Sequence, residues 1–229
     1  MAEPGTCIIV GVGPGLGAAV ARRFAAAGHP VALAARNADK LAPIVEDIAT
    51  AGGRARAYAC DGTEEADVIA LCDAAEADLG PMGVAVYNAS GRARGPIAET
   101  TLADFVDAWR RSCLGGFLLG REAARRLVQG GRGSILFTGA TASMKGYPHS
   151  ATFAVGKFGL RALAESMARE LHPQGIHVAH FNIDGGIGED GGDARLRPDA
   201  IAETYYQVHA QHRSAWSHHV EVRPWVENF

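Results

Sequence analysis

Short apolar runs alternate along the chain with longer stretches whose apolar residues recur at helical spacing. This alternation of strand-length and helix-length segments predicts a mainly parallel sheet with helices on both faces. Right-handed crossovers between the strands then give a doubly wound α/β fold. The 229 residues suit a single domain spanning 1–229, since one α/β unit can reach about 200–250 residues. We place strands at 7–10, 31–35, 56–60, 84–88, 134–138, 177–182 and 219–222, and helices at 15–28, 38–51, 64–79, 101–129, 150–172 and 198–210.

A glycine-rich run joins the first predicted strand to the first predicted helix. Gly11, Gly15 and Gly17 have the spacing G-x-x-x-G-x-G. Glycines at such a junction permit a tight turn and let backbone N–H groups approach a pyrophosphate at the helix N-terminus. The run therefore predicts a dinucleotide site, with a plain glycine-rich turn as the alternative. The residues assigned to this site are Gly11, Gly13, Pro14, Gly15, Leu16 and Gly17.

The end of the second predicted strand bears on which dinucleotide binds. An acid about twenty residues after the glycines would hold a ribose 2′-hydroxyl and favour NAD. This chain has Ala35 there, followed by Arg36, whose guanidinium can pair with a 2′-phosphate. We therefore expect NADP(H) to be preferred over NAD(H). The alternative is that Arg36 only opens the next loop.

Polar residues also follow the third and fourth predicted strands. Asp61 can accept a hydrogen bond from an adenine amino group, or cap the helix that follows. Asn88 can tie adjacent strands, form the floor of the cofactor site or make an Asx-turn. With their neighbours they complete this part of the expected cofactor site, which is Asp61, Gly62, Asn88, Ala89 and Ser90.

Composition narrows the class of protein. The formal net charge is −3, so we expect no nucleic-acid or membrane-surface partner. No run approaches the ~18 unbroken apolar residues of a membrane span, and no basic N-terminal segment with a long apolar stretch suggests secretion. The cysteines are scattered, without a C-x-x-C pair, and are expected to be reduced core thiols of a cytoplasmic protein. They are Cys7, Cys60, Cys72 and Cys113.

Histidines gather near the C-terminus, at positions 209, 212, 218 and 219. A metal site needs convergent ligands, and a strand would send His218 and His219 to opposite faces. We therefore predict no metal site.

The glycine run, Asp61, the pair Asn88 and Ala89, and Lys157 together resemble the short-chain dehydrogenase/reductase family over nearly the whole chain. The resemblance implies a single Rossmann-like domain with a seven-stranded sheet of order 3-2-1-4-5-6-7. It implies hydride transfer between a nicotinamide cofactor and a carbonyl or alcohol carbon, and dimers or tetramers formed through helices 101–129 and 150–172. The substrate loop is then the short glycine-rich segment at about 185–198. Further cofactor contacts are implied for Lys157, Asp184, Gly185 and Ile187.

The catalytic set of that family is Asn, Ser, Tyr and Lys, with the last two spaced Y-x-x-x-K. Counting back from Lys157, the tyrosine position holds Phe153; the serine position holds Ala140, and Ser112 stands where the asparagine is expected. Phe153 has no proton to give and Ala140 has no hydroxyl. General acid catalysis is worth roughly 10²–10⁴-fold, so ketone reduction by the family's route should be badly impaired. Lys157 can still bind ribose hydroxyls from the helix face that it shares with Phe153.

Other residues near this position carry protons. Tyr147 and His149 are the leading substitute acids, and Thr141 and Ser143 follow Ala140 in the same loop. For each of them, an exposed loop residue is the alternative. We expect an NADP(H)-dependent oxidoreductase with an altered active site, acting on a small or medium apolar carbonyl, imine or activated C=C compound. The alternatives are a cofactor-binding regulatory protein without redox activity, and a lyase or isomerase.

Overall fold

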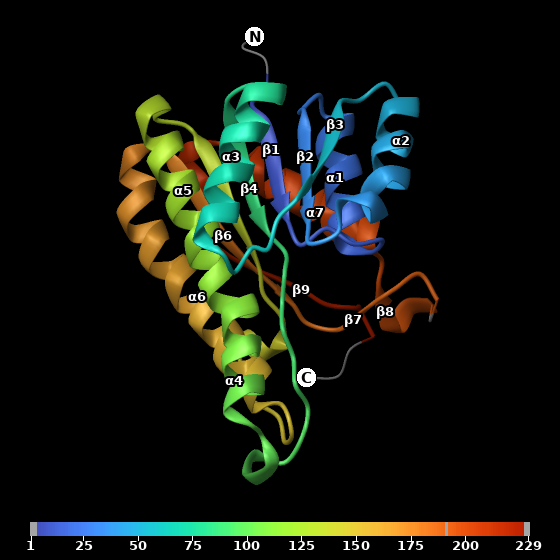
Figure 1. Ribbon diagram of the computed structural model, residues 1–229, viewed down its shortest axis with the longest axis vertical. Coiled ribbons are helices and arrows are strands. Elements are labelled where there is room, and N and C mark those ends of the chain that lie inside the picture. Colours follow the sequence, from blue (N-terminus) through green and yellow to red (C-terminus); the bar gives the residue numbers. More distant parts are fainter. Residues whose placement is uncertain (1–3, 191, 227–229) are drawn as a thin grey trace.

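The computed structural model describes residues 4–190 and 192–226. Its main sheet has seven parallel strands in the order β3-β2-β1-β4-β5-β6-β9, which confirms the predicted doubly wound topology (Figure 1). β7 and β8 pair with each other in a small separate ladder, so β9 takes the seventh place. The strands are β1 (Thr6–Val10), β2 (Val31–Ala35), β3 (Ala55–Ala59), β4 (Met82–Tyr87), β5 (Gly133–Thr138), β6 (Ile176–Ile183), β7 (Gly186–Ile187), β8 (Arg195–Leu196) and β9 (His219–Val222).

Helices cover both faces of the sheet (Figure 1). α1, α2 and α7 enclose one apolar core, and α3, α5 and α6 enclose the other. Successive residues of a strand enter different cores, so Ile8 and Ile9 of β1 are both fully buried. Burial on both faces explains why the central strands β1, β2 and β4 are nearly continuous apolar runs in the sequence. The helices are α1 (Leu16–Ala26), α2 (Ala42–Thr50), α3 (Glu65–Leu79), α4 (Leu102–Trp109), α5 (Gly115–Gly130), α6 (Ala151–Leu171) and α7 (Pro198–His209).

The helix predicted at 101–129 is divided by a π-helical turn, Arg110–Leu114, between α4 and α5. A side chain from the sheet reaches this point, because the Tyr87 hydroxyl donates to the Arg111 carbonyl at 2.6 Å. Gly115 leaves room for it, since a Cβ at that position would lie 2.1 Å from the Tyr87 oxygen. The predicted helix at 101–129 is confirmed as helical throughout, but the π-helical turn within it was not predicted, because apolar periodicity does not register a single-turn change of this kind.

The four cysteines are free. Cys7, Cys60 and Cys72 are buried, as predicted for core thiols. Cys113 is only partly buried, because it lies in the π-helical turn and packs against Gly159 of α6 rather than under the sheet.

The segment at 185–198 has more structure than a plain flexible loop. It contains β7, a short 3-10 turn (Gly192–Ala194) and β8, and the Gly188 amide donates to the Leu196 carbonyl at 3.0 Å. Residue 191 lies outside the described residues. Among the helices in the described part of the chain, none has the length and apolar character needed to cross a membrane.

Candidate active site

The glycine run forms the turn between β1 and α1. Gly11 has a φ of 91°, and a Cβ on it would lie 2.4 Å from the Ala89 amide nitrogen; a Cβ on Gly17 would lie 2.9 Å from the backbone of Val12. Gly13 and Gly15 instead face open space. The first-turn amides of a helix have no partners within it, and no side chain caps α1. This loop therefore fits a pyrophosphate at the helix N-terminus.

A cleft of about 310 Å³, which we call the glycine-loop cleft, opens beside this turn. The Thr63 amide and hydroxyl both donate to the Asp61 carboxylate, and the amide hydrogen bond is the main cause that lowers the pKa of Asp61. Asp61 thus orders its own loop. Arg36 is exposed and forms no ion pair within the described residues. The predicted cofactor residues that line the cleft are Gly11, Gly13, Arg36, Asp61, Gly62, Asn88, Ala89 and Ser90.

Asn88 connects two parts of the site. Its side-chain amide donates to the Gly11 carbonyl at 2.9 Å, and its backbone amide donates to the Val10 carbonyl at 2.8 Å. Of the alternatives that the sequence left open, the tie between adjacent strands is the one that these bonds describe. Since Asn88 also lines the cleft, the same residue forms part of its wall.

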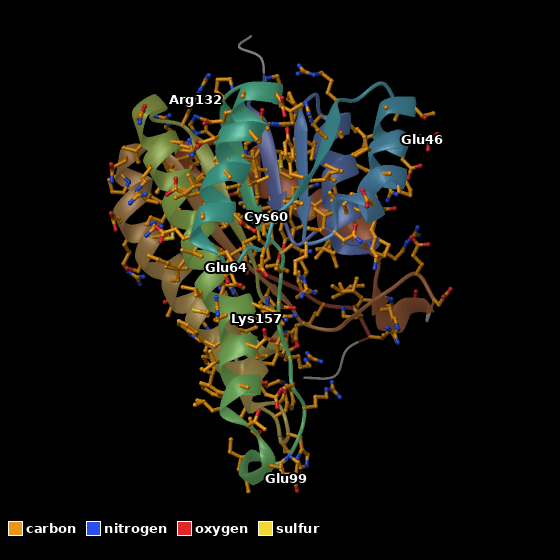
Figure 2. All side chains as sticks on the ribbon, in the orientation of Figure 1. Glu46, Cys60, Glu64, Glu99, Arg132 and Lys157 are labelled. Carbon is orange, nitrogen blue, oxygen red and sulfur yellow. The ribbon has the colours of Figure 1, made fainter. Side chains whose placement is uncertain are left out.

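Lys157 lies near the centre of the molecule in Figure 2 and is only 2% exposed. Its Nζ donates to the Thr138 carbonyl at 2.6 Å, which fixes the side chain at the carboxyl end of β5. Burial, reinforced by the positive charge of Arg92, lowers the pKa of Lys157 to about 7. The residue lines a second cleft of about 310 Å³, which we call the inner cleft.

Phe153 lies one turn before Lys157 on α6, as the spacing predicts. Its ring centroid is 5.8 Å from the Lys157 Nζ, and its ring and Ala140 both line the inner cleft. No tyrosine lines this cleft within the described residues. Tyr205 is near Thr138 but is fully buried, and its hydroxyl is hydrogen-bonded to the Thr138 hydroxyl at 2.8 Å.

Beyond Phe153 lies a third cleft of about 400 Å³, the outer cleft. Thr141, Tyr147 and His149 line it, whereas Ser143 is fully buried and its hydroxyl accepts from the Ala140 amide. His149 has a φ of 61°, in the left-handed region that a residue with a side chain rarely adopts. Three of the four suggested substitute acids therefore line the outer cleft, and Ser143 does not.

The residues after β6 form a further wall of the inner cleft. Gly185 and Ile187, to which the resemblance assigns cofactor contacts, line the inner cleft. Asp184 accepts a hydrogen bond from the Thr141 hydroxyl and forms an ion pair with Arg223 at 3.1 Å. Its carboxylate is therefore neutralised within the protein.

Two arginines that the sequence analysis did not single out also line these clefts. Arg92 and Arg94 line the outer cleft, and Arg92 lines the inner cleft as well. The signal was present in the sequence, since two arginines at alternate positions directly follow the Asn-Ala-Ser-Gly segment.

A further cleft of about 440 Å³ lies at the opposite, amino-terminal end of the strands, beside Thr6 and Pro30. It contains none of the predicted site residues, and ligands of open α/β sheets bind at the carboxyl ends. The C-terminal histidines lie apart: His209 packs against Phe24 with ring centroids 5.5 Å apart, and His219 stacks on His180 at 5.4 Å.

Comparison with known proteins bears directly on this arrangement. The sequence profile described as short chain dehydrogenase matches residues 5–185. The chain belongs to the short-chain dehydrogenase family. This short-chain dehydrogenase is 33% identical to the 7alpha-hydroxysteroid dehydrogenase of Escherichia coli (strain K12) over 175 residues. The aligned region covers 76% of this chain and 68% of that protein.

Solved structures agree. A short-chain dehydrogenase from Rhodopseudomonas palustris is 43% identical and superposes with a TM-score of 0.89, covering 96% of this chain and 99% of that one. A metagenomic short-chain oxidoreductase in complex with NADP is 27% identical, with a TM-score of 0.87 and 97% of each chain covered. Family membership and these neighbours make the present chain an oxidoreductase of the NAD(P)-dependent class.

Proposed function

We propose that this short-chain dehydrogenase is an NADP(H)-dependent oxidoreductase that transfers hydride to or from a carbonyl, imine or activated C=C carbon. One observation carries the proposal: the three clefts share walls. Asn88 and Ser90 line both the glycine-loop cleft and the inner cleft, and Ala140 and Phe153 line both the inner and the outer cleft. The clefts thus form one groove, which runs from the phosphate-binding turn past Lys157 to open space.

Arg36 supports the preference for NADP(H). Its guanidinium stands at the end of β2, beside the glycine-loop cleft and without an ion-pair partner in the described residues. An unpaired guanidinium can pair with a 2′-phosphate, whereas a 2′-hydroxyl offers it no charge.

Lys157 is the centre of the proposed chemistry. When bound, the nicotinamide supplies hydride to the substrate carbon or accepts hydride from it. Lys157 uses one N–H on the Thr138 carbonyl and has two further donors for ribose hydroxyls. The charge balance of hydride addition also needs a proton on the substrate's oxygen, nitrogen or neighbouring carbon.

That proton has several possible sources along the groove. Phe153 cannot supply it. Lys157 can, because a pKa of about 7 leaves both protonation states populated near neutral pH. Tyr147 and His149 are further candidate proton donors, but they line the outer cleft rather than the inner cleft that contains Lys157. Substrates that need little acid assistance, such as iminium ions and activated double bonds, fit this site best.

The experiment that tests the function follows NADPH oxidation by the purified chain with imines, enones and ketones. We expect turnover of imines or enones and slow turnover of simple ketones. The double variant Phe153→Tyr, Ala140→Ser should raise kcat/KM for ketones by about 10²-fold or more, because it restores an acid worth roughly 10²–10⁴-fold. NADPH binding without oxidation by any substrate class, in wild type and variant alike, would favour the non-redox alternative instead.

We also propose that the chain forms homodimers or homotetramers through α4, α5 and α6. These helices pack against one another and expose large apolar side chains to solvent. Exposed apolar surface of this kind commonly marks a protein interface. The side chains are Val106 and Trp109 of α4, Phe117 of α5, and Val155 and Phe158 of α6.

A further inference from the structure

Residues 91–95, which we call the arginine segment, are hydrogen-bonded at every second position. The Gly91 amide donates to the Ser112 hydroxyl at 3.0 Å, and that hydroxyl donates to the Gly91 carbonyl at 3.1 Å. In the same way, the Ala93 amide donates to the Thr152 hydroxyl at 3.2 Å, and that hydroxyl donates to the Ala93 carbonyl at 2.8 Å. The Gly95 amide donates to the His149 carbonyl at 3.2 Å. The backbone of the segment is therefore held at both ends and in the middle.

The alternation of the segment places the two arginine side chains together. In extended backbone, residues two apart share a face, so Arg92 and Arg94 point to the same face of the segment, which the hydrogen bonds of its backbone hold in place. Both arginines line the outer cleft. A Cβ at Gly91 would lie 2.8 Å from the Ala108 backbone, so the segment also packs closely on α4.

The charges of the two arginines are not neutralised. Within residues 4–190 and 192–226, neither Arg92 nor Arg94 forms an ion pair, and no carboxylate lines the outer cleft. Asp184 is behind Thr141 but is already paired with Arg223. Partial burial lowers the pKa of Arg92, and the charge of Arg94 lowers it further. Two cations thus share one cleft without a protein counter-charge.

Arg92 is held where the inner and outer clefts meet. Its guanidinium carbon lies 3.9 Å from the centroid of the Phe153 ring, which supports the flat guanidinium by a cation–π contact. Stacking leaves the N–H groups at the edge of the guanidinium free to donate. Arg94 lines only the outer cleft, so the pair extends from the reaction site outward.

We propose that Arg92 and Arg94 bind an anionic group, a carboxylate or a phosphate, on the substrate of this enzyme. The inference rests on the proposed function, because it names the substrate class of the same groove. Arginine pairs with both anions through two parallel hydrogen bonds, and a pre-positioned pair loses little freedom on binding. The substrate therefore carries a charged end next to the reacting carbon, which replaces the expectation of an apolar substrate.

The test measures binding to the full chain saturated with NADP⁺, which cannot reduce a ketone and so leaves the probe unchanged. The probes are phenylglyoxylate, its neutral methyl ester and phenyl phosphate, each titrated in a calorimeter. We expect at least one anion to bind about 10-fold or more tightly than the ester. The Arg92→Met, Arg94→Met variant should lose that preference while its NADP⁺ affinity stays within about 3-fold.

A matched control removes an arginine elsewhere. Arg54 is exposed before β3, at the amino end of the sheet, and Arg54→Met should change neither the anion preference nor cofactor binding. Carboxylate-only or phosphate-only binding supports the proposal and identifies the anion. Equal binding of anions and ester overturns it. So does weaker NADP⁺ binding by Arg92→Met with an unchanged preference, which would assign Arg92 to the cofactor.

The two proposals fail in different ways. A chain that binds neither NADP⁺ nor NADPH overturns the proposed function. The same titrations without cofactor then decide the present inference, since the anion preference and its loss in the double variant remain measurable.

Discussion

The Lys157 ammonium is held at the end of β5 by its hydrogen bond to the Thr138 carbonyl, in a cleft whose neighbouring wall is the bare ring of Phe153. Burial removes hydration from the charged form, and Arg92 adds repulsion, so the pKa of Lys157 falls to about 7. A lysine that titrates there can both give and take a proton at neutral pH. This is the basis on which we propose Lys157 as a source of the proton in place of a tyrosine.

This titration can be observed directly, because the chain has three lysines, Lys40, Lys145 and Lys157. With carbon-13 in lysine alone, the spectrum contains three side-chain Cε signals, and Lys157→Arg identifies the one from Lys157. We expect that signal to shift with a midpoint near pH 7, charged below and neutral above. A signal that stays constant between pH 5.5 and 8.5 would contradict the low pKa.

Arg36 leads to a second prediction for a single residue. Arg36→Gln removes the guanidinium beside the glycine-loop cleft without adding a negative charge. A lost charge-assisted hydrogen bond should weaken NADPH binding about 10- to 100-fold and leave NADH binding nearly unchanged. The measurement is the dissociation constant of each cofactor by fluorescence titration. Equal weakening of both cofactors would show that Arg36 does not read the 2′-phosphate.

Among the elements, the π-helical turn and the arginine segment depend on each other. Ser112 lies in the turn, is fully buried, and both donates to and accepts from the backbone of Gly91. A Cβ at Gly156 would lie 2.5 Å from the Ser112 Cβ, so α6 also packs closely at this point. Ser112, which we predicted to stand at the family's asparagine position, thus positions the arginine segment.

Ser112→Ala should therefore reduce stability measurably. It leaves the buried N–H and C=O of Gly91 without their partner, which costs about 1–3 kcal/mol. Urea denaturation measures the free energy of unfolding. Ser214→Ala, at an exposed serine, is the control and should stay within about 0.5 kcal/mol of wild type. A Ser112→Ala variant as stable as the control would mean that the two hydrogen bonds contribute nothing.

The sequence predicted the elements well because the signals were local. Apolar runs marked the strands, and the glycines of the first turn marked the turn between β1 and α1, where we predict that the dinucleotide binds. The π-helical turn was missed because it depends on Tyr87 and Gly115, which are distant in sequence and meet only in the folded chain. The arginine segment was missed for the same reason, since its anchors come from α6 and from the turn.

For the whole molecule, packing within one chain does not cover the exposed apolar side chains on α4, α5 and α6. On α6, Leu160 and Leu171 are buried in the core, whereas Phe158 is 42% exposed. The apolar side chains of this helix therefore contribute partly to the core and partly to the surface. Side chains of this size are depleted from solvent unless a partner covers them.

Phe158→Asp should shift the chain toward monomers, because it places a charge in the proposed interface. Sedimentation velocity of wild type and variant at matched concentrations measures the effect. Trp225 is 81% exposed near the C-terminal end of the described chain, and Trp225→Asp should leave the assembly unchanged. A wild type that sediments as a monomer at micromolar concentration would contradict the interface.

The central claim is that the groove from the glycine loop to Lys157 holds NADP(H) although no tyrosine of the described residues lines the inner cleft. Calorimetric titration of the full chain with NADPH, and in parallel with NADH, tests it most directly. We predict saturable binding of about one NADPH per chain, with NADH bound more weakly. The absence of saturable binding of either cofactor to folded protein would contradict the account.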